Sequence, residues 1–201
     1  MAIRTITRHT LEPLLREQLT SLPAGRVVEI GVSKNYSPYK KWIPNTEYIT
    51  VDQRASFNPH LCADACNLGI KSDSVDTVVI LEVLEHTLFP YNVVQEIHRI
   101  LKPGGKCILS TRFIFPYHPS PKDYYRFTRD ALETFFKVFS SVSVFEHGNR
   151  FQAVWQIMLD RELFGRKPMH IKIMRRFNKL IAQIMSTNKL VPLGYLVIAK
   201  K

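Results

Sequence analysis

The stretch that decides the fold is Arg26-Val27-Val28-Glu29-Ile30-Gly31, a β-branched run closed by a glycine. A short continuous apolar run bounded by turn residues is typical of a buried strand. Two further runs of this kind occupy residues 48–52 and 75–81, and polar or turn residues follow each of them. Strands that are apolar throughout are buried on both faces, which favours a parallel sheet covered by helices.

Helical segments alternate with these strands. Between residues 92 and 101 the apolar residues fall at helical spacing, and Lys102-Pro103-Gly104-Gly105 ends that helix. The other expected elements are a helix over 11–19, a strand over 106–111, a helix that begins after Thr128, strands over 141–146 and 193–199, and two helical pieces within 149–187. The alternation predicts an α/β domain with a mostly parallel sheet.

The composition excludes several classes of protein. The chain has 201 residues, of which 45% are apolar and 22% charged, a balance typical of one globular domain with a well-filled core. No run approaches 18 uncharged apolar residues, so no membrane-spanning helix is expected. Arginine and glutamate are spread through residues 1–20, which disfavours a secretory signal and makes the cytoplasm the default location. Cys62, Cys66 and Cys107 lack the spacing of a zinc site, so we expect free thiols and assign no metal ligand.

The charge is concentrated near the end of the chain. Residues 1–160 carry 18 basic and 16 acidic side chains, whereas residues 161–201 carry ten basic side chains and Glu162 alone. Such asymmetry indicates a basic surface that faces phosphates of nucleic acid, lipid or nucleotide-linked substrates. A solvated face that only aids solubility is the alternative.

A basic amphipathic helix is expected over residues 171–185. Ile171, Met174 and Phe177 recur at helical spacing, and basic residues occupy the other faces. These basic residues are Lys172, Arg175, Arg176 and Lys179. Three interpretations stay open: the helix packs on the domain, it lies on an anionic membrane as a peripheral contact, or it meets a nucleic acid or a protein.

Two strand ends predict a nucleotide-type ligand. Asp52 closes the second strand 21 residues after Gly31 closes the first, the separation at which an acid commonly binds ribose hydroxyls. A carboxylate suits this task because its two oxygens can accept from both hydroxyls. The segment after Gly31 has none of the further glycines that let a backbone approach a pyrophosphate, which disfavours a nicotinamide cofactor.

The order of these segments resembles the class I S-adenosylmethionine-dependent methyltransferases, in particular the type 11-like group. The resemblance covers residues 24–112 and rests on a series of motifs. They are Val27-Val28-Glu29-Ile30-Gly31, Val51-Asp52, Ala63-Asp64-Ala65, the strand over 76–81, Glu82-Val83-Leu84-Glu85-His86 and Leu101-Lys102-Pro103-Gly104-Gly105. It implies one domain over residues 1–201, with a Rossmann-like mostly parallel sheet, helices on both faces, an antiparallel last strand, and residues 149–187 as a basic helical insertion before that strand.

The resemblance also implies a set of cofactor contacts. Glu29 and Gly31 would shape the loop under the methionine part of S-adenosylmethionine, and Asp52 would hold the ribose. Asp64 and Ala65 would face the adenine, and Leu81, Glu82 and His86 would line the other side of the cofactor. Lys34 stands near the place of the family's second glycine, a departure from the family pattern.

A second cluster spans residues 115–128 and follows the strand after Gly105. Its prolines fix an extended path, and it presents an imidazole, a carboxylate, phenols and a guanidinium, a surface suited to recognising a polar substrate. The segment is similar to methyltransferases associated with polysaccharide and cell-envelope glycan synthesis. We predict His118 as the base, Asp123 as the carboxylate that orients or replaces it, and Tyr124, Tyr125 and Arg126 as substrate-binding residues.

Structural roles compete with each of these predictions. The carboxylates can cap turns or pair locally, Leu81 can be core, Glu82-to-His86 can be a polar helix start, and Asp123 can pair with Arg126. The sequence predicts an enzyme that transfers a methyl group from S-adenosylmethionine to a hydroxyl of a sugar or glycan. Two alternatives stay open: a nucleic-acid methyltransferase or binder that uses the basic C-terminal region, and a non-catalytic domain with the same fold.

Overall fold

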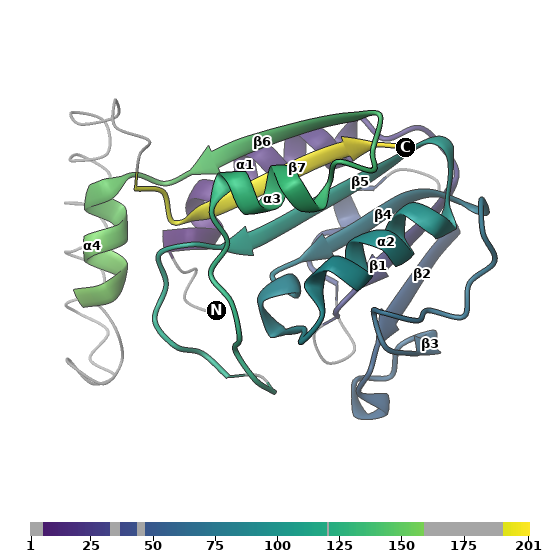
Figure 1. Cartoon of the computed structure of the whole chain (residues 1–201), viewed down its shortest axis with the longest axis horizontal. Helices are drawn as coiled ribbons and strands as arrows, with labels where there is room; N and C mark the ends of the chain where they lie inside the picture. The colour runs from purple at the N-terminus through teal and green to yellow at the C-terminus, as the bar shows by residue number, and fades with distance from the viewer. Residues whose placement is uncertain (1–5, 33–36, 44–46, 120, 159–190) are drawn as a thin grey trace.

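Among the described residues, seven strands form one sheet in the order β3-β2-β1-β4-β5-β7-β6 (Figure 1). The computed structural model describes residues 6–32, 37–43, 47–119, 121–158 and 191–201. The strands are β1 Arg26–Ile30, β2 Glu47–Asp52, β3 Leu61–Cys62, β4 Val75–Leu81, β5 Leu101–Arg112, β6 Ser141–His147 and β7 Gly194–Lys200. The pairings from β3 through β5 are parallel, and β7 is antiparallel to both β5 and β6. The predicted mostly parallel sheet with an antiparallel last strand is confirmed.

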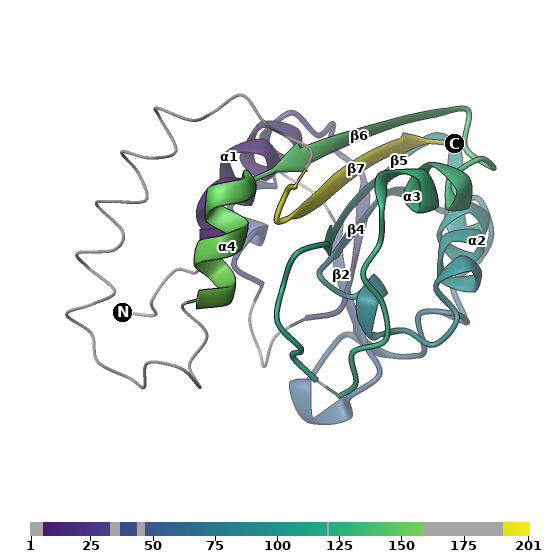
Figure 2. The ribbon, with the colours of Figure 1, turned by 60° about the vertical axis from the view of Figure 1, so that its left-hand side comes forward.

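Helices cover both faces of the sheet, as Figures 1 and 2 show. The helices are α1 Ile6–Thr20, α2 Pro90–Ile100, α3 Arg129–Phe135 and α4 Arg150–Met158, and η1 Lys40–Trp42, η2 Ala55–Phe57 and η3 Leu84–His86 are single 3-10 turns. On one face α1 packs through Leu11, Leu15 and Leu19 against Val27 and Val79. On the other face α2 and α3 pack against alternate residues of the same strands, such as Val28 and Val78. Because successive side chains of a strand point to opposite faces, each apolar strand supplies both cores.

The helix ends follow their sequence signals. Pro90 stands in the first turn of α2, where its missing N–H costs no hydrogen bond. Thr128 caps α3, and its Oγ1 accepts a hydrogen bond from the Ala131 N–H at 3.2 Å. These caps fix the entry of the two helices that cover the sheet beside the carboxyl ends of β4 and β5.

The structure differs from the sequence-based predictions at β5 and at β3. The segment 102–105 was expected as a turn before a strand over 106–111, but β5 begins at Leu101 and includes it. Val75 pairs with Leu101 and Thr77 with Lys106, so a bulge absorbs the extra residues and keeps the strand continuous. β3 was not predicted, since a strand of two residues is too short to show a pattern.

Part of the predicted insertion lies outside the described residues. Helix α4 occupies the beginning of the segment 149–187. The remainder, with the basic amphipathic helix predicted over 171–185, lies outside the described residues, as does Lys34. None of the helices in the described parts of the chain has the length and apolar character needed to cross a membrane.

Candidate active site

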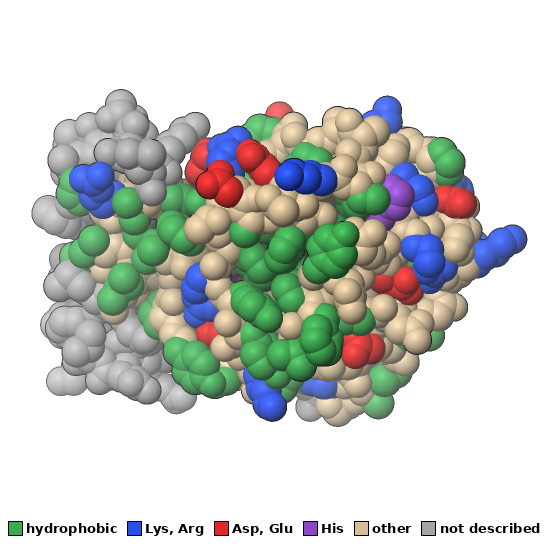
Figure 3. All heavy atoms as spheres, in the orientation of Figure 1, with side chains coloured by type: hydrophobic (Ala, Val, Ile, Leu, Met, Phe, Trp, Pro, Cys, Tyr) green, Lys and Arg blue, Asp and Glu red, His purple; other side chains and the backbone are tan. Residues whose placement is uncertain are grey.

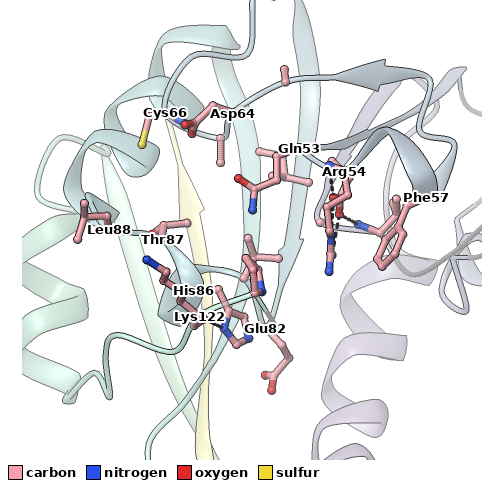
Figure 4. Close-up of a pocket in the computed structure, with 18 of the residues that line it drawn as sticks. Gln53, Arg54, Phe57, Asp64, Cys66, Glu82, His86, Thr87, Leu88 and Lys122 are labelled. Atoms are coloured by element: carbon pink, nitrogen blue, oxygen red, sulfur yellow. Dashed lines mark hydrogen bonds and ion pairs between the residues drawn. The ribbon is translucent and has the colours of Figure 1, made fainter. Parts of the chain in front are cut away.

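A pocket of about 720 Å³ opens at the carboxyl ends of β1, β2 and β4. This is the edge of a parallel sheet where ligands bind, because loops and unpaired N–H groups converge there. The predicted residues that line it are Gly31, Asp52, Asp64, Ala65, Leu81, Glu82, His86 and Tyr124. Figure 4 shows Gln53 between Asp64 on one side of the pocket and Glu82 on the other.

Gly31 shapes the floor of the pocket. Its φ is +80°, and a Cβ at this position would overlap Cγ2 of Val83. Its N–H donates to the Val51 carbonyl at 2.8 Å, which holds the turn at the end of β1 against β2. A side chain here would be strained by both the backbone and the close contact, so the position requires glycine.

Asp52 is buried at the end of β2, and its carboxylate is fully engaged. The Val32 N–H donates to Oδ2 at 3.2 Å and the Arg54 N–H to Oδ1 at 2.9 Å. The Arg54 guanidinium donates to both oxygens, at 3.0 and 3.2 Å, and stacks 3.8 Å from the centre of the Phe57 ring. A ligand that uses this carboxylate must therefore share it with Arg54 or displace Arg54.

Glu29 does not line the pocket. Its Oε2 accepts a hydrogen bond from the Tyr48 hydroxyl at 2.6 Å, and Tyr48 contacts Ser37 in turn. Burial raises the pKa of Glu29, although the hydrogen bond from Tyr48 opposes this. Glu29 lies just before Gly31, so its place is compatible with the predicted role of shaping the loop.

Asp64 and Cys66, which follow β3, also line the pocket. Asp64 Oδ1 accepts from the Cys66 N–H at 2.8 Å, and the Asp64 carbonyl accepts from the Asn67 N–H at 2.9 Å. Burial, followed by the charge of Asp64, raises the pKa of Cys66 to about 11. The three cysteines are free thiols, as predicted.

Glu82 occupies a strained position at the end of β4. Its φ is +58°, which a non-glycine residue rarely adopts. Its Oε1 accepts from the Ser110 hydroxyl at 2.9 Å, and its Oε2 forms an ion pair with Arg112 at the end of β5. The sequence analysis missed Arg112, because its pairing with Glu82 depends on the register of two neighbouring strands.

Glu85, one turn later in η3, is fully buried. Its Oε2 accepts from the Thr111 hydroxyl at 2.9 Å. Its Oε1 has no hydrogen-bond partner among the described residues and lies 4.0 Å from Arg112 Nε. Burial, reinforced by the negative charge of Glu82, raises the pKa of Glu85 to about 8. The site thus contains a buried carboxyl group with one unsatisfied oxygen, and sequence reasoning had assigned it no role.

The predicted pair of His118 and Asp123 is formed. His118 Nδ1 lies 3.0 Å from Asp123 Oδ2, which also accepts from the His118 backbone N–H at 2.9 Å. His118 Nε2 lies 4.0 Å from Glu85 Oε1, and the His118 ring meets the His86 ring edge-on at 4.9 Å. Burial is the largest cause that lowers the pKa of His118, while Asp123 opposes it.

Arg126 fixes the loop that carries this pair. Its guanidinium donates to both oxygens of Asp123 at 2.6 Å and to the carbonyls of Phe115 and Pro116. These contacts outweigh burial and hold the pKa of Asp123 below its usual range. Arg126 therefore has a structural role, and its predicted contact with substrate stays a prediction.

The two tyrosines of the loop differ in position. Tyr124 lines the pocket, whereas Tyr125 does not and donates its hydroxyl to the Leu88 carbonyl at 3.0 Å. The backbone N–H groups of both donate to the Glu85 carbonyl, at 2.9 and 3.3 Å. The loop over 113–127 is thereby tied to η3. Figure 3 shows apolar side chains gathered on the face that Figure 1 assigns to this loop and the start of α2.

Comparison with known proteins shows which domain part of the chain is similar to. Residues 39–109 match the family model described as a methyltransferase domain, and no curated protein matches the chain. Phosphoethanolamine N-methyltransferase 2 of Haemonchus contortus, in complex with phosphomonomethylethanolamine and S-adenosylhomocysteine, is 17% identical with a TM-score of 0.61, and the match covers 94% of this chain and 52% of that one. This chain spans about half the length of that enzyme.

Two shorter proteins match over most of their length. A SAM-dependent methyltransferase of Archaeoglobus fulgidus is 16% identical with a TM-score of 0.61, over 95% of this chain and 93% of that one. A SAM-dependent methyltransferase of Thermotoga maritima is 16% identical with a TM-score of 0.62, over 98% and 91%. At these identities the likeness shows the fold. Together with the domain match, it confirms the resemblance predicted from the sequence.

Proposed function

We propose that this chain, which carries a methyltransferase domain with the fold of the S-adenosylmethionine-dependent enzymes, transfers a methyl group from S-adenosylmethionine to a hydroxyl of a sugar or glycan-type acceptor. The observation that carries the proposal is the pocket at the carboxyl ends of β1, β2 and β4. Most of it is lined by residues of the matched segment, and it contains the buried carboxylate of Asp52.

The residues of the pocket suit the parts of this cofactor. Gly31 leaves room for the methionine part, and Asp52 presents two carboxylate oxygens to the ribose hydroxyls. Asp64, Ala65, Leu81, Glu82 and His86 all line the pocket, and we assign the first two to the adenine and the others to the other side of the cofactor. Arg54 occupies both oxygens of Asp52, so ribose binding replaces an ion pair with hydrogen bonds.

The chemistry requires little from the protein beyond positioning. S-adenosylmethionine supplies an electrophilic methyl group, and an attacking hydroxyl must be held in line with it and shielded from water. A hydroxyl also has to lose its proton as the new bond forms. His118 is suited to accept that proton at Nε2, because Asp123 and Pro116 hold its Nδ1 side and thereby its ring orientation.

The acceptor is proposed from the surface around the pocket. Leu88, Phe89 and Tyr124 line its mouth and are 51%, 59% and 40% exposed. The apolar side chains of Leu88 and Phe89 suit the apolar surface of a sugar ring, and Tyr124 adds a hydroxyl that can hydrogen-bond to it. The likeness of the segment 115–128 to glycan-associated methyltransferases points to the same class of acceptor.

Two measurements test the proposal in order. Calorimetry should detect S-adenosylmethionine binding by the wild-type protein, weaker binding by Asp64→Ala, and unchanged binding by Asp130→Ala, an exposed carboxylate in the first turn of α3. Release of S-adenosylhomocysteine should then be measured with sugars, nucleotide sugars, lipid-linked glycans, amines and RNA. Absence of cofactor binding would favour a non-catalytic domain, and turnover with RNA alone would favour the nucleic-acid alternative.

The peripheral membrane contact remains a separate proposal. It rests on the basic residues of segment 171–185, each of which contributes about 1 kcal/mol near an anionic bilayer. Vesicle sedimentation should show binding to anionic but not neutral lipid, and the binding should disappear when Lys172, Arg175, Arg176 and Lys179 are changed to glutamine. Equal binding to both lipids would contradict it.

A further inference from the structure

Three side chains with metal-binding atoms converge beside the pocket. Glu85, His86 and His118 each have a potential ligand atom within 4.8 Å of the others. Glu85 and His86 follow β4, and His118 follows β5, the neighbouring strand in the sheet. Atoms bound tetrahedrally to one ion at about 2.0 to 2.2 Å lie about 3.3 Å apart. Movements of these ligand atoms by about 1 Å would therefore allow all three to bind one ion.

The two imidazoles are already oriented as metal ligands are. His118 Nδ1 lies 3.0 Å from Asp123 Oδ2, and His86 Nδ1 lies 2.5 Å from the Lys122 carbonyl oxygen. Metal-bound histidines almost always engage their other ring nitrogen with a carboxylate or a backbone carbonyl in this way. Both rings therefore keep Nε2 for an ion.

The carboxylate of this set, Glu85, has one oxygen available to bind an ion. Glu85 is fully buried, and its Oε1 lacks a hydrogen-bond partner among the described residues. A buried carboxylate oxygen without a partner is costly and is satisfied by a proton or a cation. The nearby guanidinium of Arg112 is paired with Glu82 and has its Nε 4.0 Å from Oε1, and that of Arg126 is paired with Asp123. Neither arginine hydrogen-bonds to Oε1.

We propose that Glu85, His86 and His118 bind one divalent transition-metal ion, such as Zn²⁺, at the edge of the cofactor pocket. One carboxylate and two imidazoles form the donor set of an open site, which keeps a position for a water or a substrate oxygen. His86 lines the pocket, so the open position faces the ligand space. No spacing in the sequence indicates this ligand set, because His118 lies far from Glu85 and His86 along the chain.

The ion would deepen the function proposed above, on which this part of the inference rests. A hydroxyl bound to the ion loses its proton more readily than a free one. His118 Nε2 cannot bind the ion and accept a proton in the same molecule, so the ion would replace the histidine base. The ion-bound hydroxyl would release its proton to solvent water, and its oxygen would bond to the methyl carbon as the bond from that carbon to the cofactor sulfur breaks. Asp123 then acts as a positioning residue that fixes the His118 ring.

Direct metal binding tests the site without any activity assay. Full-length protein without a histidine tag is treated with a chelator, dialysed, and titrated with Zn²⁺ by calorimetry and with Co²⁺ by visible absorption. We expect one ion per chain and a Co²⁺ spectrum typical of low coordination number. Glu85→Gln, His86→Asn and His118→Asn should abolish the site. Asp123→Asn should weaken binding about 10- to 100-fold and should alter the Co²⁺ spectrum without abolishing it.

Controls separate this site from nonspecific binding and from misfolding. His9→Asn and His98→Asn replace histidines outside the cluster and should bind the ion as the wild type does. Thermal unfolding and circular dichroism establish that each variant is folded, because His86 lines the pocket and its replacement can change cofactor binding directly. Less than one ion per chain in the wild type, or one ion per chain retained by folded His86→Asn, would overturn the inference. Metal binding without cofactor binding would instead leave the site intact and refute the methyltransferase proposal.

Discussion

Two buried carboxylates, Asp52 in the lining of the pocket and Glu85 outside that lining, differ in how they are satisfied. Asp52, at the end of β2, accepts from two backbone N–H groups and from the Arg54 guanidinium. Glu85, after β4, accepts from Thr111 on one oxygen and leaves the other without a hydrogen-bond partner among the described residues. Both oxygens of Asp52 therefore have hydrogen-bond partners before a ligand binds, whereas only one oxygen of Glu85 has a partner among the described residues.

This difference predicts that the two carboxylates affect cofactor affinity and turnover separately. A satisfied carboxylate contributes to affinity only by the difference between its old and new partners. An unsatisfied carboxyl group beside two imidazoles is costly to the fold and is retained where it serves a reaction or an ion. We therefore expect changes near Asp52 to alter cofactor affinity, and changes near Glu85 to alter turnover.

The largest expected effect is on turnover at the Glu85 end. His118→Asn should lower kcat by about two to four decades, because the group that takes or helps remove the acceptor proton is lost. S-adenosylmethionine affinity should be unchanged, since His118 does not line the pocket. Steady-state kinetics and calorimetry on the same samples measure both, with His98→Asn as the control. If His86→Asn shows this pattern and His118→Asn does not, the two histidines exchange roles.

A second buried side chain, His147, tests whether a buried polar atom without a hydrogen-bond partner is enough to indicate a ligand site. His147 is buried, its Nδ1 meets the Thr10 hydroxyl at 3.0 Å, and its Nε2 has no hydrogen-bond partner among the described residues. Burial lowers the pKa of His147 to about 4. Below the unfolded pKa of about 6.5 the unfolded state binds the proton first, so the folded protein should lose about 3 kcal/mol as the pH falls from 6.5 to 4.

Denaturant unfolding at a series of pH values measures this loss. His147→Gln removes the titrating group, so its unfolding free energy should fall less between pH 6.5 and 4 than that of the wild type. Equal slopes in both proteins would show that His147 does not titrate in this range. Among the described residues no set of three metal-binding side chains includes His147, so we expect a cost in stability there and no ion.

A smaller effect is expected at the Asp52 end. Asp52→Ala would remove the two charge-assisted hydrogen bonds that we propose to the ribose, so S-adenosylmethionine binding should weaken by about 1.5 to 3 kcal/mol, which is about 10- to 100-fold. Calorimetry measures the change, and kcat at saturating cofactor should remain close to that of the wild type. Unchanged binding by folded Asp52→Ala would remove Asp52 from the cofactor site.

The smallest expected effect is an increase in cofactor affinity. Arg54→Met releases the Asp52 carboxylate from an ion pair whose arginine is 33% exposed, and such pairs are worth about 1 kcal/mol or less. Cofactor binding should therefore tighten by up to about fivefold. Calorimetry alongside Asp52→Ala sharpens the comparison, because weaker binding by Arg54→Met would mean that the guanidinium itself contacts the cofactor.

Local patterns in the sequence predicted the frame of the fold and one end of the site. The apolar runs located β1, β2 and β4, and their ends identified Gly31 and Asp52, because parallel strands bring their carboxyl ends to one edge. β3 is too short to show a pattern, and the bulge in β5 depends on its pairing with β4. Arg112 and Thr111 reach Glu82 and Glu85 from β5, far along the chain, so no local pattern records these contacts or the unsatisfied oxygen of Glu85. Arg54 lies only two residues after Asp52, but its pairing with that carboxylate depends on the turn after β2.

The place of β7 between β5 and β6 has a consequence for the order of assembly. Among the described strands β6 pairs only with β7, and β7 is contributed by residues 194–200, far along the chain from β5. The edge of the sheet therefore cannot be completed until the late segment has docked against β5, which makes this closure a slow, long-range step. In pulse-labelled hydrogen exchange during refolding, amides of β6 should become protected no earlier than those of β7. Protection of β6 and β7 together before β5 would show that the two strands first form a separate hairpin.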